Sequence, residues 1–222
     1  MSDPVQIIQI ISIWALPVLF AITLHEVAHG WMAWRLGDPT AMLMGRLSLN
    51  PIRHIDPIGT ILLPAGLVAM GSPFVFGWAK PVPVNFDGLK NPKRDSIWVS
   101  LAGPGANLGM ALFWALITWL GGHLPASAAY FAEPMQLMGM AGITINLVLM
   151  VLNLIPIPPL DGGRVAAGLL PGPLSYQFSK LEPYGFIILI VLLFTGMLGT
   201  FMGPIVSSLR QIFFALGGAP ML

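Results

Sequence analysis

The chain contains no cysteine among its 222 residues. Structural disulfides and thiolate metal sites are therefore excluded, and any bound metal must be held by nitrogen and oxygen ligands from His, Asp and Glu. Charge is also scarce, because only 9% of the residues are charged, against roughly 25% in a soluble domain. The net charge of +1 and the lack of basic clusters interleaved with aromatic residues argue against a nucleic-acid partner.

Apolar sequence dominates the chain: hydrophobic residues make up 56% of it, and the mean hydropathy is +0.82. A helix needs about 20 apolar residues to cross a bilayer. Stretches of this length run over 5–24, 97–120, 135–155 and 184–203. We therefore expect a single membrane-embedded domain over 1–222, built as an all-α polytopic membrane protein with about 4–6 transmembrane helices. Its C-terminal helices are expected within 184–217.

A further apolar stretch, 57–77, is interrupted by glycines and prolines and has basic residues on both flanks. The positive-inside rule places both flanks in the cytoplasm, which favours a re-entrant or partly inserted hairpin over a complete span. We therefore expect a short β-rich or re-entrant insertion after the first helix. In this orientation the N-terminus and the loop 121–134 lie outside, whereas 35–94, Arg164 and Lys180 lie inside.

An H-E-x-x-H motif, formed by His25, Glu26 and His29, lies in a segment with no other ionisable side chain between Asp3 and Arg35. On a helix, positions i and i+4 share one face, so both imidazoles converge on a single metal while the glutamate handles a water proton. The motif alone arises by chance in roughly one chain of this length in a few hundred. However, a charge at the bilayer centre costs about 3 kcal/mol or more, which favours a metal site over histidines merely hydrogen-bonded among packed helices.

Catalytic zinc usually has three protein ligands and one open position, so two histidines need a partner. The candidates are His54, Asp56, Glu133, Asp161 and Glu182. Asp161 is the best placed, because it follows a proline-broken helix and precedes Gly162-Gly163, which lets the backbone turn a carboxylate toward the interior. The alternative interpretation is that Asp161 caps the next short helix.

Two motifs together resemble those of the site-2 protease family, the intramembrane zinc metalloproteases of peptidase family M50. They are HEVAHG at 25–30 and NLIPIPPLDGG at 153–163. SLAGPGANL at 100–108 and GWAKPVPVN at 77–85 extend the resemblance over most of the chain from 20 to 165. The chain has no room for a PDZ or CBS domain, so it resembles a minimal prokaryotic form of the family.

The resemblance implies a role for each residue that matches a family motif. His25, His29 and Asp161 correspond to the ligands of one zinc ion per chain, and Glu26 to the catalytic glutamate. Asn153 corresponds to an asparagine that assists substrate or oxyanion binding; alternatively, it hydrogen-bonds carbonyls freed by the proline break.

A proline-rich segment, 79–85, reads as extended chain because each proline imposes extended geometry on the residue before it. The segment resembles one that, in the family, is like a strand edge and pairs with the substrate backbone. This resemblance makes Lys80, Pro81, Val82 and Pro83 candidate substrate-binding residues. A plain connector is the alternative, with the Lys80 side chain reaching the membrane interface.

Two other polar residues are given structural interpretations. Asn107 is expected to bridge neighbouring helices. His54 is expected to be a surface histidine near the lipid headgroups, with an outer-shell or gating role as the alternative.

The expected activity is hydrolysis of peptide bonds within or near transmembrane segments of membrane-protein substrates. Because His25 lies about 20 residues into the first helix, the site is expected toward the cytoplasmic side of a prokaryotic plasma membrane. One alternative is another membrane zinc protease, such as a prenyl-protein protease, with Glu182 as the third ligand. The other is a non-catalytic protein that binds or transports a metal, although transport needs a polar path across the bilayer.

Overall fold

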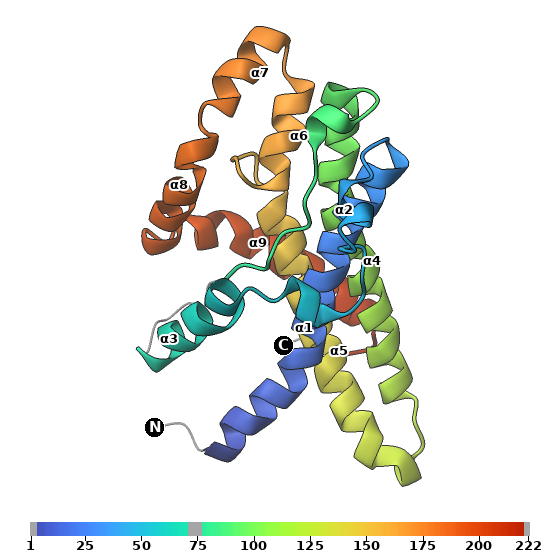
Figure 1. Cartoon of the computed structure of the whole chain (residues 1–222). Coiled ribbons are helices and arrows are strands. Elements are labelled where there is room, and N and C mark those ends of the chain that lie inside the picture. Colours follow the sequence, from blue (N-terminus) through green and yellow to red (C-terminus); the bar gives the residue numbers. More distant parts are fainter. Residues whose placement is uncertain (1–3, 71–76, 220–222) are drawn as a thin grey trace.

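The structure is a computed structural model that describes residues 4–70 and 77–219 (Figure 1). Every regular element in this part of the chain is a helix, which confirms the all-α expectation. The α-helices are α1 (Pro4–Arg35), α2 (Thr40–Leu43), α3 (Leu63–Ala69), α4 (Pro92–Gly122), α5 (Ala129–Asn153), α6 (Asp161–Leu169), α7 (Gly172–Ser179), α8 (Glu182–Phe194) and α9 (Met197–Leu216). Short 3₁₀ turns cover Pro51–His54, Phe86–Gly88 and Ala126–Ala128, and a π-helix covers Pro57–Leu62.

Three of the described helices are long and apolar enough to cross a membrane: Ile8–Arg35, Pro92–Gly122 and Ala126–Asn153. The pair α7 and α8, bent by 61°, makes a fourth if it acts as one broken span. The expected span 184–203 does not form one helix. Gly196 has a φ of +75°, a left-handed conformation that glycine adopts without steric cost, and the chain turns there from α8 into α9.

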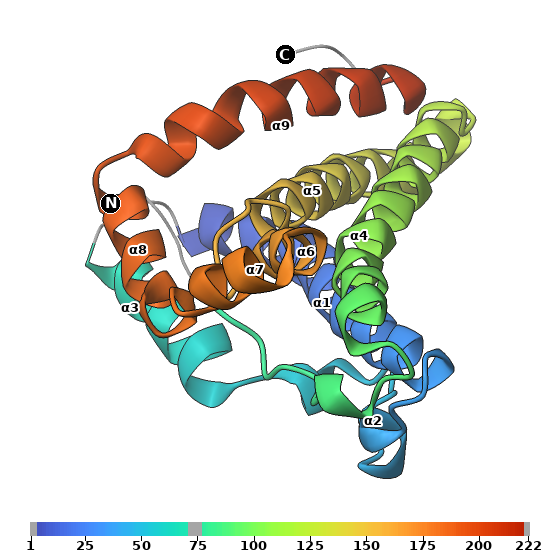
Figure 2. The ribbon, with the colours of Figure 1, turned by 90° about the horizontal axis from the view of Figure 1, so that it is seen from above.

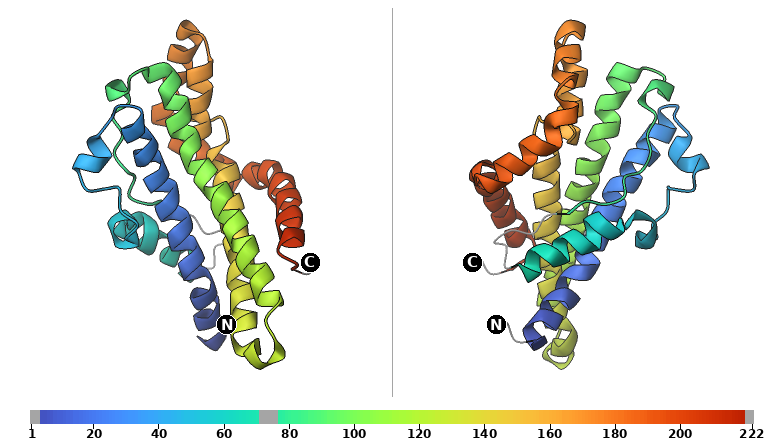
Figure 3. Two further views of the ribbon diagram at one scale, coloured as in Figure 1. Left: turned by 90° about the vertical axis from the view of Figure 1, so that its right-hand side faces the viewer. Right: turned by 60° about the vertical axis from the view of Figure 1, so that its left-hand side comes forward.

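The three long helices α1, α4 and α5 form the centre of the molecule, and α9 crosses them on the side away from α2 and α3 (Figures 2 and 3). Glycines let α4 and α5 approach closely: a Cβ atom at Gly142 would overlap the Trp114 ring, and one at Gly139 would overlap Thr118. Small residues at such contacts are how helices pack in lipid, where burial of apolar surface gives little driving force. Phe213 of α9 packs in the buried hydrophobic cluster that also contains Trp114.

The insertion after α1 leaves the bundle and returns to it. Asp56 caps the π-helix by accepting hydrogen bonds from the backbone N–H groups of Ile58 and Gly59. Helix α3 then projects away from the bundle (Figure 3). When the described chain resumes it is extended over 77–85, and Trp78 N–H donates back to the Gly59 carbonyl. The described residues include no strand, so a β-rich insertion is not confirmed.

The end of α1 fixes where this extended segment lies. Gly37, with a φ of +119°, ends the helix, and Asp38 N–H donates to the Ala33 carbonyl at 2.9 Å. The Asp38 side chain, only 1% exposed, accepts hydrogen bonds from the Thr40 N–H and hydroxyl and from Asn85 N–H at 2.7 Å. Burial alone would raise the pKa of Asp38, but these three donors favour the carboxylate and hold its pKa below the usual range.

This joint gives the fold a pH dependence. Because the folded-state pKa of Asp38 lies below its unfolded value of about 3.9, the carboxylate stabilises the fold above that pH. That contribution disappears as the pH falls through the folded-state pKa. We therefore expect Asp38→Asn to lower the unfolding midpoint at pH 6, with the difference from wild type shrinking below about pH 4. The measurement is the midpoint of thermal unfolding in detergent for both proteins across this pH range.

Asp87→Asn is the matched control, since Asp87 is exposed and makes no hydrogen bond through its side chain in the described part of the chain. A difference between Asp38→Asn and wild type that stays constant from pH 6 to pH 3 would contradict the role given to the ionised Asp38.

Candidate active site

Three ligand atoms from α1 and α6 converge on one point. His25 Nε2 and His29 Nε2 lie 3.0 Å apart, and Asp161 Oδ2 lies 3.3 Å from the first and 3.2 Å from the second. Ligands of a tetrahedral zinc ion with bonds of about 2.0–2.1 Å lie about 3.3 Å from one another. Asp161 Oδ2 is buried and accepts no hydrogen bond from a described residue. The donor set and its spacing therefore fit zinc.

The other nitrogen of each imidazole fixes which one is free for a metal. His25 Nδ1 lies 2.7 Å from Asn107 Oδ1, and His29 Nδ1 lies 2.7 Å from the Val99 carbonyl oxygen. Both partners are acceptors, so each ring carries its hydrogen on Nδ1 and keeps a lone pair on Nε2. Without a cation between them, the two lone pairs and the carboxylate would repel one another.

Asn107 holds His25 as part of a polar chain through the bundle. It is fully buried, and its Nδ2 donates to the Ala21 carbonyl at 3.2 Å and to Asn146 Oδ1 at 3.0 Å. These two bonds orient the Asn107 amide so that its oxygen faces His25. Asn107 therefore bridges helices, as expected, and also positions a ligand, which the sequence analysis missed. The sequence signal for that second role was weak: a polar residue in the apolar segment SLAGPGANL, 82 residues from His25.

Helix α4 can approach the two imidazoles only because residue 103 is glycine. A Cβ atom at Gly103 would overlap His29 Nε2 and His25 Cε1. Ala102 and Pro104 flank it in the sequence, but neither offers this space. Gly103 is therefore part of the wall of the metal centre.

Glu26 is anchored by the extended segment. Its Oε2 accepts a hydrogen bond from Val82 N–H at 2.7 Å, and Val82 itself is buried. A carboxylate has two oxygens, so this bond orients Glu26 while Oε1 stays available for a proton. The sequence predicted both residues for the site but not this contact, which joins positions 56 apart.

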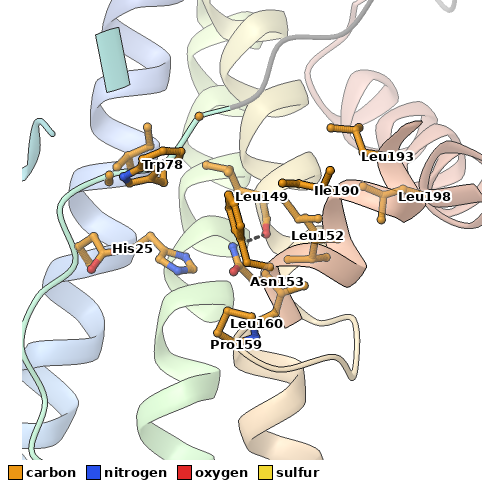
Figure 4. Close-up of a pocket in the computed structure, with 16 residues that line it drawn as sticks. His25, Trp78, Leu149, Leu152, Asn153, Pro159, Leu160, Ile190, Leu193 and Leu198 are labelled. Atoms are coloured by element: carbon orange, nitrogen blue, oxygen red, sulfur yellow. Dashed lines mark hydrogen bonds between the residues drawn. The ribbon is translucent and has the colours of Figure 1, made fainter. Parts of the chain in front are cut away.

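Two neighbouring cavities meet at these residues. A cavity of about 290 Å³ is lined by His25, Glu26, His29, Pro81, Val82, Val84, Phe86, Val99, Ser100, Asn153, Pro159, Leu160, Asp161 and Arg164. A larger cavity of about 590 Å³ shares His25, Glu26 and Asn153 with it and is otherwise mostly apolar (Figure 4). Trp78 and Phe186 line the larger cavity and meet edge to face, with ring centroids 6.1 Å apart.

Asn153 lies between the two cavities. Its Nδ2 donates to the Leu149 carbonyl of its own helix at 3.0 Å. Its Oδ1 makes no hydrogen bond within the described part of the chain. Asn153 is thus at the site, and the NH₂ group of its amide is bonded to its own helix.

The other candidate substrate residues divide into two groups. Pro81 and Val82 line the smaller cavity, whereas Lys80 and Pro83 line neither. The backbone of Lys80 is tied down instead, since its N–H donates to the His54 carbonyl and its own carbonyl accepts from Arg46. Trp78 and Ala79, just before the predicted group, do line the larger cavity.

His54 is not the surface histidine that the sequence suggested. It is only 2% exposed, and its Nε2 donates to the Ser48 carbonyl at 2.8 Å. Basic neighbours made it look exposed, but the 3₁₀ turn Pro51–His54 folds it against α1. Glu182 is also away from the metal group, because it pairs with Arg164 at 2.9 Å on the surface.

A helical membrane protein with a His-His-Asp group beside a glutamate has the parts of a membrane-embedded metalloprotease. Residues 122–195 match the model of peptidase family M50. YwhC of Bacillus subtilis, named as a candidate zinc metalloprotease, is 38% identical to this chain over 195 residues. The matched residues make up 87% of this chain and 85% of YwhC.

A second relative, Rip2 of Mycolicibacterium smegmatis, carries the same kind of name. It is 33% identical over 180 residues, which are 80% of this chain and 64% of Rip2. No solved structure matches the chain. The chain belongs to peptidase family M50, the site-2 proteases, and is an intramembrane zinc metalloprotease. A non-catalytic protein that binds or transports a metal, one of the alternatives considered from the sequence, is not favoured.

The space left by Gly103 gives a sharp test of the metal centre. We expect Gly103→Ala to lower bound zinc by about 10-fold or more, because the new methyl group displaces the imidazoles. Gly105→Ala is the matched control on the same helix, since a Cβ atom there meets no other residue in the described part of the chain. Zinc content of the two purified variants is the measurement. Equal zinc in both would contradict the close approach of α4 to the histidines.

Proposed function

We propose that His25, His29 and Asp161 hold one zinc ion and that Glu26 carries protons for peptide-bond hydrolysis. The observation that carries this proposal is the convergence of two imidazole lone pairs and a carboxylate oxygen within 3.3 Å of one another. When bound, zinc supplies the Lewis acid that polarises the reacting water and carbonyl.

Glu26 does the proton transfer. Its Oε1 takes a proton from the attacking water as the new carbon–oxygen bond forms. As the carbon–nitrogen bond breaks, Glu26 returns that proton to the leaving amine. The bond from Val82 N–H holds the carboxylate in place through both transfers. No covalent intermediate with the protein is needed.

The extended segment is proposed to bind the substrate backbone. Proline has no N–H, so Pro81 and Pro83 add carbonyl acceptors to the segment without matching donors. The Pro81 carbonyl accepts from Arg46 at 3.3 Å and keeps a second lone pair. A transmembrane helix must be unwound before a protease can reach its amides, and the exposed N–H groups then need acceptors. Ala79 and Val82 line the two cavities that share Glu26, and Asn153, which lines both cavities, is proposed to contact the substrate as well.

The substrate is proposed to be an apolar segment of a membrane protein. The larger cavity is lined mainly by leucine, isoleucine and aromatic side chains, including Leu149, Leu152, Phe186 and Leu193. These apolar side chains fit those of a transmembrane helix, and the polar residues His25, Glu26 and Asn153 line the cavity where it meets the smaller one. The pocket opens next to His25 and Glu26, so a bond in such a segment reaches the reacting groups.

The active site is proposed to lie toward the cytoplasmic side of a prokaryotic plasma membrane. The C-terminal end of α1 and the N-terminal end of α4 lie at the same end of the bundle as α6 and α7 (Figure 1). That end carries Arg35, Lys93, Arg94, Arg164 and Lys180, as the positive-inside rule requires of a cytoplasmic face.

Glu26→Gln tests the mechanism. Glutamine keeps an oxygen for the Val82 N–H but cannot take up a proton, so we expect cleavage of a reconstituted transmembrane substrate to fall by about 10²–10⁴-fold. Zinc content should stay at the wild-type level, whereas Asp161→Ala should lose zinc and Glu182→Ala should keep it. Undiminished cleavage by Glu26→Gln would refute the mechanism.

The lack of cysteine allows a clean test of orientation. Single cysteines at Ser127, in the turn before α5, and at Gln177, on α7, are both exposed. A membrane-impermeant thiol reagent added to intact cells should label Ser127→Cys and spare Gln177→Cys, and inverted vesicles should show the reverse. The opposite pattern would place the site on the outer side.

A further inference from the structure

Ser100 has a buried hydroxyl that nothing in the described chain uses. The residue is 1% exposed, and its Oγ has no hydrogen-bond partner. Hydroxyl groups on apolar helices normally donate to a carbonyl of the preceding turn, as Ser12 does to Ile8, Ser96 to Lys93 and Thr118 to Trp114. Buried polar groups almost always have a partner, so the free hydroxyl of Ser100 points to a missing one.

The hydroxyl lies at the metal centre. Ser100 lines the cavity of about 290 Å³ together with His25, Glu26, His29 and Asp161. It precedes Gly103 by three residues and Asn107 by seven, so all three share the face of α4 that is turned to the centre. Gly103 lies against both imidazoles, and Asn107 holds His25.

The packing of α4 on α6 brings Ser100 level with Asp161. A Cβ atom at Gly168 would meet the Ile97 side chain and the Lys93 carbonyl, so this face of α4 packs on α6. The two helices run in opposite directions (Figure 1). Ser100 lies seven residues beyond Lys93, and Asp161 lies seven residues before Gly168. Each step advances about 10 Å along its helix, so the two residues arrive at the same height.

The three metal-site ligands are oriented differently by their neighbours. His25 donates to Asn107 and His29 to the Val99 carbonyl, whereas no described residue donates to the Asp161 carboxylate. Its Oδ2 faces the two imidazoles, as a zinc ligand would, and its Oδ1 also accepts no hydrogen bond from a described residue. Carboxylate ligands of metals are usually held by a hydrogen bond from a neighbouring group. One ligand lacks a donor, and one donor in the same cavity lacks an acceptor.

We propose that Ser100 is a positioning residue whose hydroxyl donates a hydrogen bond to the Asp161 carboxylate when zinc is bound. This inference rests on the proposed function, in which Asp161 is a zinc ligand. The hydroxyl can turn toward the carboxylate, because it is bonded to no described residue. It completes a set in which α4 holds all three ligands, through Asn107, Val99 and Ser100.

The zinc dissociation constant of the purified protein, measured by competition with a chelator, tests the proposal. Ser100→Ala is expected to weaken zinc binding by about 10–100-fold, without a change in the unfolding midpoint of the zinc-free protein. Ser96→Ala is the matched control one turn away, where the hydroxyl bonds the Lys93 carbonyl, and it should leave zinc binding unchanged. Wild-type zinc affinity in Ser100→Ala overturns the inference.

If Ser100→Ala does not fold, Ser100→Thr is measured in its place, because threonine keeps the hydroxyl. Wild-type zinc affinity in Ser100→Thr then supports the proposal, and affinity weakened by about 10-fold or more overturns it. Asp161→Ala in the same assay separates this inference from the proposed function. If Asp161→Ala keeps zinc, the ligand set itself is wrong. If Asp161→Ala loses zinc and Ser100→Ala keeps it, only the role of Ser100 fails.

Discussion

Two imidazole lone pairs and a carboxylate oxygen are held about 3 Å apart at the centre of an apolar bundle, and this arrangement constrains the rest of the structure. Such groups repel one another unless a cation lies between them, and a membrane interior offers little water to screen the repulsion. The fold must therefore hold the ligand atoms in place against that repulsion. It does so through the Val99 carbonyl and the Asn107 amide, and Asn107 also links α4 to α1 and α5.

Each long helix contributes differently to that task. Helix α1 carries His25, Glu26 and His29 on one face, and α4 supplies the acceptors and the space that orient the imidazoles. Helix α5 ends at Asn153, and the proline-rich loop after it delivers Asp161. That loop folds tightly onto the start of α6, since a Cβ atom at Gly162 would overlap the Leu154 carbonyl. Gly162 and Gly163 lie inside α6 and have no positive φ, so the pair serves this close packing and not the turn expected from the sequence.

The sequence predicted those parts of the site that depend on local spacing. The i, i+4 histidines share a helix face whatever the tertiary fold, and the proline break made Asp161 stand out among five carboxylate and histidine candidates. The contacts of Asn107 with His25 and of Glu26 with Val82 join residues 82 and 56 positions apart. No local pattern reports such pairs, because they depend on how whole helices pack.

The errors have equally physical causes. An apolar window of 20 residues does not show whether a glycine inside it will adopt a left-handed φ, so the break at Gly196 was not visible. The charge of neighbouring residues suggested that His54 is exposed, but burial depends on what packs over a turn. His54 is buried because its segment folds back on α1, and its carbonyl then anchors Lys80.

In the proposed mechanism the extended segment and the catalytic glutamate form one unit. Two carboxylates of the α1 region hold the segment, Glu26 at Val82 N–H and Asp38 at Asn85 N–H, so its position along α1 is fixed at both points. The same segment lines both cavities beside the metal centre. A substrate strand that paired with it would therefore be placed relative to Glu26 by a continuous set of hydrogen bonds. Binding and proton transfer would then share one frame, which makes a rigid segment more useful here than a mobile loop.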